Sequence, residues 1–295
     1  MRRKWGSTDV LLCNFFMGGL LTMYTPAEVA SNVIGIGRTK ASLKIYQMLM
    51  LGFLAGMFIA LAAVGCNTIS CSIQTASVAK FVGAAIFPVG LAMVLLAGSE
   101  LFTGNCLMII SVLEKKVRLY EMLKNWLFVY IGNFCGSIFV AALIYFGGQL
   151  DLFGGALAVS TIKVAAAKAS LSFGKAIILG ILCNFLVCIA VWISFAAKTV
   201  GAKFAGLFMP IMLFVGCGFE HSVANMYYVP AGLFAVSNPD YAAAAAETVT
   251  NIGNLTWGNF FLHNLIPVTI GNIIGGMVLV GMMYWGIYLK GKDAK

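Results

Sequence analysis

The chain has 295 residues, of which 61% are hydrophobic and 10% are charged, and its mean hydropathy is +0.96. Soluble domains carry about 25% charged residues, so this composition excludes a soluble domain and predicts a protein that crosses a membrane several times. The net charge of +9 does not indicate a nucleic-acid partner, because the basic residues are distributed by side of the membrane and form no single patch.

The first 25 residues are predicted to be an extension of the membrane domain. The apolar stretch from Asp9 to Tyr24 is too short to span a bilayer, and no small-residue cleavage pattern marks it as a signal peptide. Thr25-Pro26-Ala27-Glu28 has the form of a helix start, with an N-cap, a first-turn proline and a capping box. We therefore expect an interfacial helix over residues 26–36 that leads into the first span.

Six apolar segments follow, each long enough for the roughly 20 helical residues that a bilayer requires. They lie near residues 43–65, 81–113, 122–147, 173–197, 203–235 and 262–289. Most lysines and arginines fall on one predicted side, and the exceptions are Lys80, Lys163, Lys168 and Lys175. Because cytoplasmic loops are enriched in basic residues, both termini are predicted to be cytoplasmic. The membrane domain comprises residues 26–289 and precedes a tail over residues 290–295.

The second and fifth segments share the pattern G-x-E-x-x-x-x-N. The pattern begins at Gly98 and at Gly218, and its carboxylates are Glu100 and Glu220. A carboxylate at membrane depth is costly, so its duplication beside a glycine predicts two broken helices that meet near the midplane. We expect the glycines and glutamates to be structural, with each carboxylate accepting hydrogen bonds from backbone N–H groups exposed at the opposite break.

The third and sixth segments repeat as well. Asn125, Gly132, Asn133 and Gly136 align in order with Asn264, Gly271, Asn272 and Gly275. Three spans followed by three similar spans place the second half in the opposite orientation. The predicted fold is therefore an all-α membrane protein with six transmembrane helices in two inverted three-helix repeats, near residues 43–147 and 173–289. The Gly-x-x-x-Gly pairs predict close helix packing.

Candidate functional residues gather at the two breaks. His221 follows Glu220 directly, and a histidine at membrane depth is a functional candidate. Thr103, Asn225 and Asn184 are polar residues among apolar neighbours, and such residues either line a pore or cross-bond helices. Four apolar residues are ordinary span residues by themselves, but their positions near the breaks also suit hydrophobic constrictions. These residues are Phe87, Leu101, Phe102 and Phe214.

Several motifs, in the same order along the chain, resemble those of the formate/nitrite transporter family. They are Phe87 to Leu91, Gly98 to Asn105, Asn125-Trp126 with Gly132-Asn133, Phe219 to Met226, and Asn264 to Asn272. The resemblance runs from about Thr25 to Leu289. It implies an aquaporin-like bundle of six helices, assembled as a homopentamer in which every protomer has its own pore.

The resemblance also implies roles for individual residues. His221 corresponds to the family's central histidine, and Thr103 to the threonine of its flexible loop. Its apolar constrictions correspond to Phe87, Leu101, Phe102 and Phe214. Its outer lysine, which is expected to draw anions into the external mouth, and the asparagine partner of that lysine correspond to Lys168 and Asn184, which lie sixteen residues apart.

We therefore expect a channel or transporter for small monovalent weak-acid anions in the plasma (inner) membrane, with formate as the first candidate and protons involved at His221. Ala224-Asn225-Met226 and Pro267-Val268-Thr269 are more similar to formate members than to nitrite members. Nitrite, hydrosulfide, acetate and lactate stay open. A neutral-solute channel of the aquaporin type should carry two Asn-Pro-Ala motifs, and the sequence contains none.

Enzymatic activity is not expected. A membrane enzyme needs a catalytic constellation or a folded domain outside the bilayer, and the predicted loops are too short for one. The cysteines within the spans show no metal-ligand spacing, so we expect neither a metal nor a cofactor. Cys66 and Cys71 lie in a predicted external loop, where they could form a disulfide.

Overall fold

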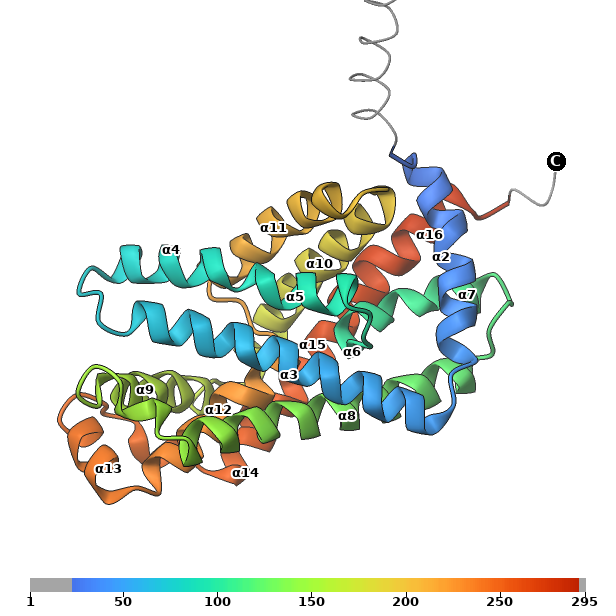
Figure 1. Ribbon diagram of the computed structural model, residues 1–295. Helices are drawn as coiled ribbons and strands as arrows, with labels where there is room; N and C mark the ends of the chain where they lie inside the picture. Colours follow the sequence, from blue (N-terminus) through green and yellow to red (C-terminus); the bar gives the residue numbers. More distant parts are fainter. Residues whose placement is uncertain (1–22, 292–295) are drawn as a thin grey trace, which may run out of the picture.

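The computed structural model describes residues 23–291, and their regular structure is helical apart from one isolated bridge between Met23 and Ala197. Figure 1 shows the long helices side by side in one bundle. Five helical segments are long and apolar enough to cross a membrane, and two shorter apolar helices accompany them. The predicted all-α membrane class is therefore confirmed. Most of the predicted extension and tail lies outside the described residues.

The first described helix, α2 (Pro26–Ala41), begins as the sequence predicts. The Thr25 side chain accepts a hydrogen bond from the backbone N–H of Glu28, and the Glu28 carboxylate accepts one from the backbone N–H of Thr25. These reciprocal bonds satisfy donors that a helix start leaves open. The helix continues five residues beyond the predicted end, so that Lys40 reaches the bundle from its last turn.

Two tightly packed helix pairs form the bundle. In the first half, α3 (Ile45–Ser70) packs on α8 (Leu119–Phe146), and a methyl group on Gly136 would collide with the Phe53 carbonyl. In the second half, α10 (Phe173–Ala196) packs on the last apolar segment, where a methyl group on Gly275 would collide with the Ile181 carbonyl. Glycine thus lets the backbones approach closely in both pairs, as predicted.

The last apolar segment is a continuous helix with two π-helical stretches. Its parts are α14 (Trp257–Asn259), η4 (Phe260–Leu265), α15 (Ile266–Ile273), η5 (Ile274–Met282) and α16 (Met283–Tyr288). The first π stretch ends just before Pro267. Proline lacks the N–H that an α-helix needs, and wider turns commonly accommodate such positions in membrane helices.

The second and fifth segments stop and restart at the G-x-E-x-x-x-x-N motifs. The second consists of α4 (Ala76–Ile86), α5 (Pro88–Leu96), α6 (Phe102–Asn105), η1 (Cys106–Met108) and α7 (Ile109–Leu113). The fifth consists of α11 (Val200–Gly216) and α12 (Ser222–Val236). Gly98 and Gly218 have φ values of +80° and +72°, a left-handed conformation that favours glycine.

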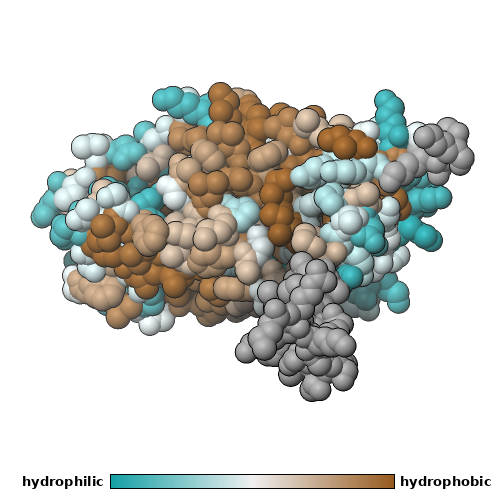
Figure 2. Space-filling model, turned by 90° about the horizontal axis from the view of Figure 1, so that it is seen from above, coloured by the Kyte–Doolittle hydropathy of each residue, from teal (hydrophilic) through white to brown (hydrophobic). Residues whose placement is uncertain are grey.

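Shorter helices close one end of the bundle. They are η2 (Gln149–Asp151), α9 (Ala156–Ala169), α13 (Pro239–Ala246) and η3 (Ile252–Asn254). In Figure 1, α9 and α13 lie at the left end, and α2 and α16 lie toward the right end. Figure 2 shows brown hydrophobic atoms over the middle of the molecule and hydrophilic atoms gathered at both ends. An apolar middle between polar ends is the pattern of a protein that crosses a bilayer.

Candidate transport pathway

Each buried glutamate of the two breaks forms an ion pair with a lysine from a preceding short helix. Lys40 Nζ donates to Glu100 Oε1 at 2.6 Å. Lys168 Nζ donates to both carboxylate oxygens of Glu220, at 2.9 and 3.0 Å. The expectation that these carboxylates accept hydrogen bonds from backbone N–H groups is wrong. They accept from lysine ammonium groups and asparagine amide groups instead.

The asparagine that ends each motif joins its glutamate to the following span. Asn105 Nδ2 donates to Glu100 Oε2 at 2.8 Å and to Asn125 Oδ1 at 2.8 Å. Asn225 Nδ2 donates to Glu220 Oε2 at 2.7 Å and to Asn264 Oδ1 at 2.7 Å. The two halves therefore hold their breaks with the same set of side chains, and buried carboxylates of this kind require such partners.

The backbone N–H groups at the helix restarts bond to asparagines of the third and sixth spans. Phe102 N donates to Asn133 Oδ1 at 3.0 Å, and Ser222 N donates to Asn272 Oδ1 at 2.9 Å. The amide nitrogen of Asn133 donates to the carbonyls of Gly52 and Glu100, and that of Asn272 to the carbonyls at the equivalent positions. Each asparagine thus satisfies groups that lipid cannot solvate.

The two breaks differ at the residue that follows the glutamate, which is Leu101 in the first and His221 in the second. His221 Nε2 lies 3.0 Å from the Thr103 hydroxyl oxygen, and both side chains are buried. His221 Nδ1 accepts a hydrogen bond from the backbone N–H of Ala224 at 3.1 Å. Because an accepting nitrogen carries no proton, the neutral ring has its proton on Nε2 and donates it to Thr103.

Aromatic rings surround this contact unequally. The Phe214 ring centroid lies 6.0 Å from that of His221 and 5.7 Å from that of Phe87. Phe102 packs instead on Trp126 and Tyr130 of α8, at centroid distances of 5.7 and 4.9 Å. The structure therefore brings Phe214 next to the histidine and Phe87 next to Phe214, whereas Phe102 is held against the third span.

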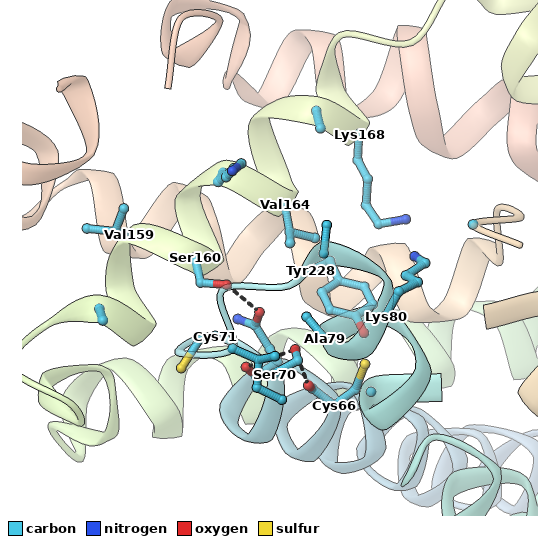
Figure 3. A pocket seen from close by; sticks show the side chains of 18 of the residues that line it. Cys66, Ser70, Cys71, Ala79, Lys80, Val159, Ser160, Val164, Lys168 and Tyr228 are labelled. Atoms are coloured by element: carbon cyan, nitrogen blue, oxygen red, sulfur yellow. Dashed lines mark hydrogen bonds between the residues drawn. The ribbon is translucent and has the colours of Figure 1, made fainter. Parts of the chain in front are cut away.

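A cavity of about 1480 Å³ opens between α4, α9, α11, α12 and α13 and reaches the histidine. Its lining includes Phe87, Phe214, His221, Asn225 and Lys168. Figure 3 shows one part of it, where Lys80 and Lys168 come from different helices and lie near the Tyr228 ring. Among residues 23–291, no group of three histidine, cysteine or acidic side chains is placed to hold a metal ion. We refer to this cavity as the vestibule.

Comparison with known proteins identifies the family. The sequence model described as formate/nitrite transporter matches residues 27–286. The chain belongs to the formate/nitrite transporter family.

Relatives of this family member are similar over nearly their whole length. An uncharacterized transporter of Bacillus subtilis is 41% identical, over 90% of this chain and 94% of the relative. The formate channel FocA of Haemophilus influenzae is 38% identical, over 88% and 92%. A solved pentameric formate channel with formate bound superposes with a TM-score of 0.74 at 36% identity, over 83% of this chain and 98% of that channel.

In this transporter-family chain, Asn184 does not pair with Lys168. Its amide nitrogen donates to the carbonyl of Thr103 at 3.2 Å and to that of Asn272 at 2.7 Å. The asparagine that bonds to Lys168 is Asn264, whose amide nitrogen donates to the lysine carbonyl at 3.2 Å. Asn184 therefore ties the first break to the last span, and the sixteen-residue spacing does not identify the partner of the lysine.

Sequence reasoning missed Lys40 as a member of the network and placed it among the basic residues that set membrane orientation. Its position nevertheless carried a signal. Lys40 lies 12 residues before Gly52, and Lys168 lies 12 residues before Gly180, the equivalent glycine of the other packed pair.

Cys66 and Cys71 are free thiols, so the disulfide that the sequence left open is not formed.

Proposed function

We propose that this protein passes small monovalent weak-acid anions across the cytoplasmic membrane, with formate as the first candidate. The observation that carries the proposal is the buried Thr103 and His221 pair at the end of an open vestibule, beside the rings of Phe87 and Phe214. Relatives named formate channels over most of the chain support the choice of formate.

An anion cannot cross this region bare, because an unpaired charge in an apolar medium costs several kcal/mol at least. Loss of water beyond the vestibule favours the protonated carboxyl form. The anion therefore takes up a proton that the water of the vestibule relays from the bulk solution, passes the rings as the neutral acid, and releases the proton on the far side. One proton then accompanies each anion, and no charge remains inside the membrane.

His221 and Thr103 offer the hydrogen bonds that this neutral acid needs. The Nε2 proton of His221 can donate to the carbonyl oxygen of the acid in place of Thr103 Oγ1. The Thr103 hydroxyl can accept from the acid O–H, since a hydroxyl both donates and accepts. The Ala224 bond to Nδ1 keeps the ring oriented while Nε2 changes partner. Passage then exchanges hydrogen bonds without leaving the Nε2 proton or the acid O–H unpaired.

We further propose that the chain crosses the membrane six times in two inverted halves with both termini in the cytoplasm, and assembles as a pentamer. The matching networks around Glu100 and Glu220 support the inverted halves. The solved pentameric formate channel supports the assembly. Wide exposure of apolar side chains on single protomers, such as Phe146, Met209 and Leu262, suits contact with lipid or a neighbouring copy.

Flux in liposomes tests the proposed function. Stopped-flow assays should show rapid entry of formate relative to glycerol, while nitrite and hydrosulfide measure how broad the selectivity is. His221→Ala should lower the formate rate and alter its pH dependence. His263→Ala is the matched control, because His263 is exposed and lies outside the vestibule. If His221→Ala leaves both rate and pH dependence unchanged, the role of the central histidine is wrong.

A further inference from the structure

Lys80 extends from α4 across the vestibule toward the second helix break, at Gly218. It belongs to the first turns of α4 and lines the cavity. Its Nζ lies 3.8 Å from the position that a Cβ atom on Gly218 would occupy. Gly218 precedes Glu220 by two residues and His221 by three. The ammonium group of Lys80 therefore lies beside the backbone that leads to the histidine.

Lys168, the other lysine at this depth, already has an anionic partner. Both of its carboxylate contacts are with Glu220, at 2.9 and 3.0 Å, and its ammonium also lies 5.3 Å from the Tyr228 ring centroid. The pair of Lys40 with Glu100 repeats this arrangement in the other half. A lysine–glutamate ion pair that is present in both halves stabilises the helix breaks. The charge of Lys168 is therefore neutralised by Glu220.

Lys80 has no such neutralising partner. Within residues 23–291 the ion pairs are those of Lys40, Lys168 and Arg118, each with a glutamate. No carboxylate of the described residues is therefore bonded to the ammonium of Lys80. An exposed, unpaired cation beside a low-dielectric wall attracts anions more strongly than one on an open surface.

The remaining charges of the vestibule are negative on balance. Besides Lys80, Lys168 and Glu220, the charged residues of its lining are Lys163, Asp151, Asp240 and Glu247. Carboxylates thus outnumber lysines in this second group, and Asp151 accepts a hydrogen bond from Tyr241. With Lys168 and Glu220 cancelling each other, Lys80 supplies the positive charge next to the break. Without it, the carboxylates would dominate the vestibule.

Lys80 is also specific to one half of the repeat. The two motifs are offset by 120 residues, as Gly98 and Gly218 show, and this offset places Val200 at the position equivalent to Lys80. The residues that the two motifs share stabilise the helix breaks. The residues that differ at equivalent positions, such as Leu101 and His221, distinguish the two halves. Counted back from the two motifs, Lys80 therefore corresponds to a valine in the other half.

We propose that Lys80 captures the anion in the vestibule and delivers it to the Thr103 and His221 pair. Its ammonium binds the carboxylate or another monovalent anion through hydrated contact, and the anion leaves this site when it takes a proton. This role rests on the proposed function, since it concerns the same anion and the same pathway. Lys168 then stabilises the break and contributes little to anion capture.

Substitution of Lys80 tests the proposal through the concentration dependence of flux. In liposomes at about 0.02 M ionic strength, Lys80→Ala should raise the half-saturating formate concentration about tenfold and change the maximal rate less than twofold. Lys80→Arg should keep both values near those of the unsubstituted protein. At about 0.5 M salt the difference between alanine and lysine should shrink, because the Debye length falls to about 4 Å.

Lys175→Ala is the control, because Lys175 is exposed at the start of α10 and does not line the vestibule. Size-exclusion chromatography in detergent establishes that each variant assembles like the unsubstituted protein. If Lys80→Ala shows the same half-saturating concentration and salt dependence as Lys175→Ala, the capture role is wrong. If the unsubstituted protein itself passes no formate, the proposed function fails instead, and the two failures are thus distinguishable.

Discussion

Thr103→Val removes the hydroxyl that meets His221 and keeps the shape of the side chain. In the folded protein the Thr103 oxygen accepts from His221 Nε2 over 3.0 Å, and both residues are at most 3% exposed. Valine leaves the Nε2 proton without an acceptor in a buried site. The imidazole cannot recover by turning over, because Nδ1 is held by the backbone N–H of Ala224 at 3.1 Å.

The magnitude follows from the cost of one unpaired buried donor, which is about 1–3 kcal/mol. If the passing acid needs the hydroxyl as its acceptor, its barrier rises by a similar amount. Since 1.4 kcal/mol corresponds to about tenfold in rate, Thr103→Val should slow formate flux by about 5-fold to 150-fold.

The assay is stopped-flow formate uptake into liposomes across a range of external pH. Thr103→Ser is the matched control, because serine retains the hydroxyl and loses only a methyl group, and it should stay within about threefold of the unsubstituted rate. A Thr103→Val protein that assembles normally and transports formate at the Thr103→Ser rate would refute the hydrogen-bonding role of this pair.

The other predictions concern stability and are measured by thermal unfolding in detergent. Asn272→Ala removes the acceptor of the Ser222 N–H and the side-chain donor to the Glu220 carbonyl and should destabilise by at least about 2 kcal/mol; an unchanged Tm would contradict it. Lys168→Met leaves Glu220 buried and uncompensated and should cost about 3–5 kcal/mol, most of which the added Glu220→Gln should restore. Gly218→Ala, at φ +72°, should cost about 1–2 kcal/mol, whereas the control Gly216→Ala has room for a methyl group and should not.

Much of the fold could be read from local pattern. Apolar length gives membrane helices because a bilayer of fixed thickness requires about 20 helical residues. Thr25 and Glu28 predicted the start of α2, since a capping box depends on neighbours three residues apart. Gly98 and Gly218 predicted interruptions, because their left-handed conformation is a local property. The end of α2 was predicted too early, because its last turn is stabilised by the bundle through Lys40.

Side-chain partners were predicted less well. Glu100 and Glu220 were recognised as structural candidates, but the sequence did not show that lysines from short preceding helices would meet them. Asn184 was assigned to the wrong contact, because spacing along one segment says nothing about which other span faces it. The roles of Phe87, Leu101 and Phe214 in a constriction stay predictions.

The sequence by itself determined that this chain is a membrane protein of internally repeated segments, with polar residues gathered at two interrupted helices. These properties follow from composition, apolar length and motif repetition, which are all local or additive along the chain. Only the tertiary structure decided that Thr103 meets His221 across 118 residues, that Lys168 is occupied by Glu220, and that Lys80 lies beside Gly218. Contacts of this kind depend on how helices pack against one another, and packing fixes distances that spacing along the chain does not.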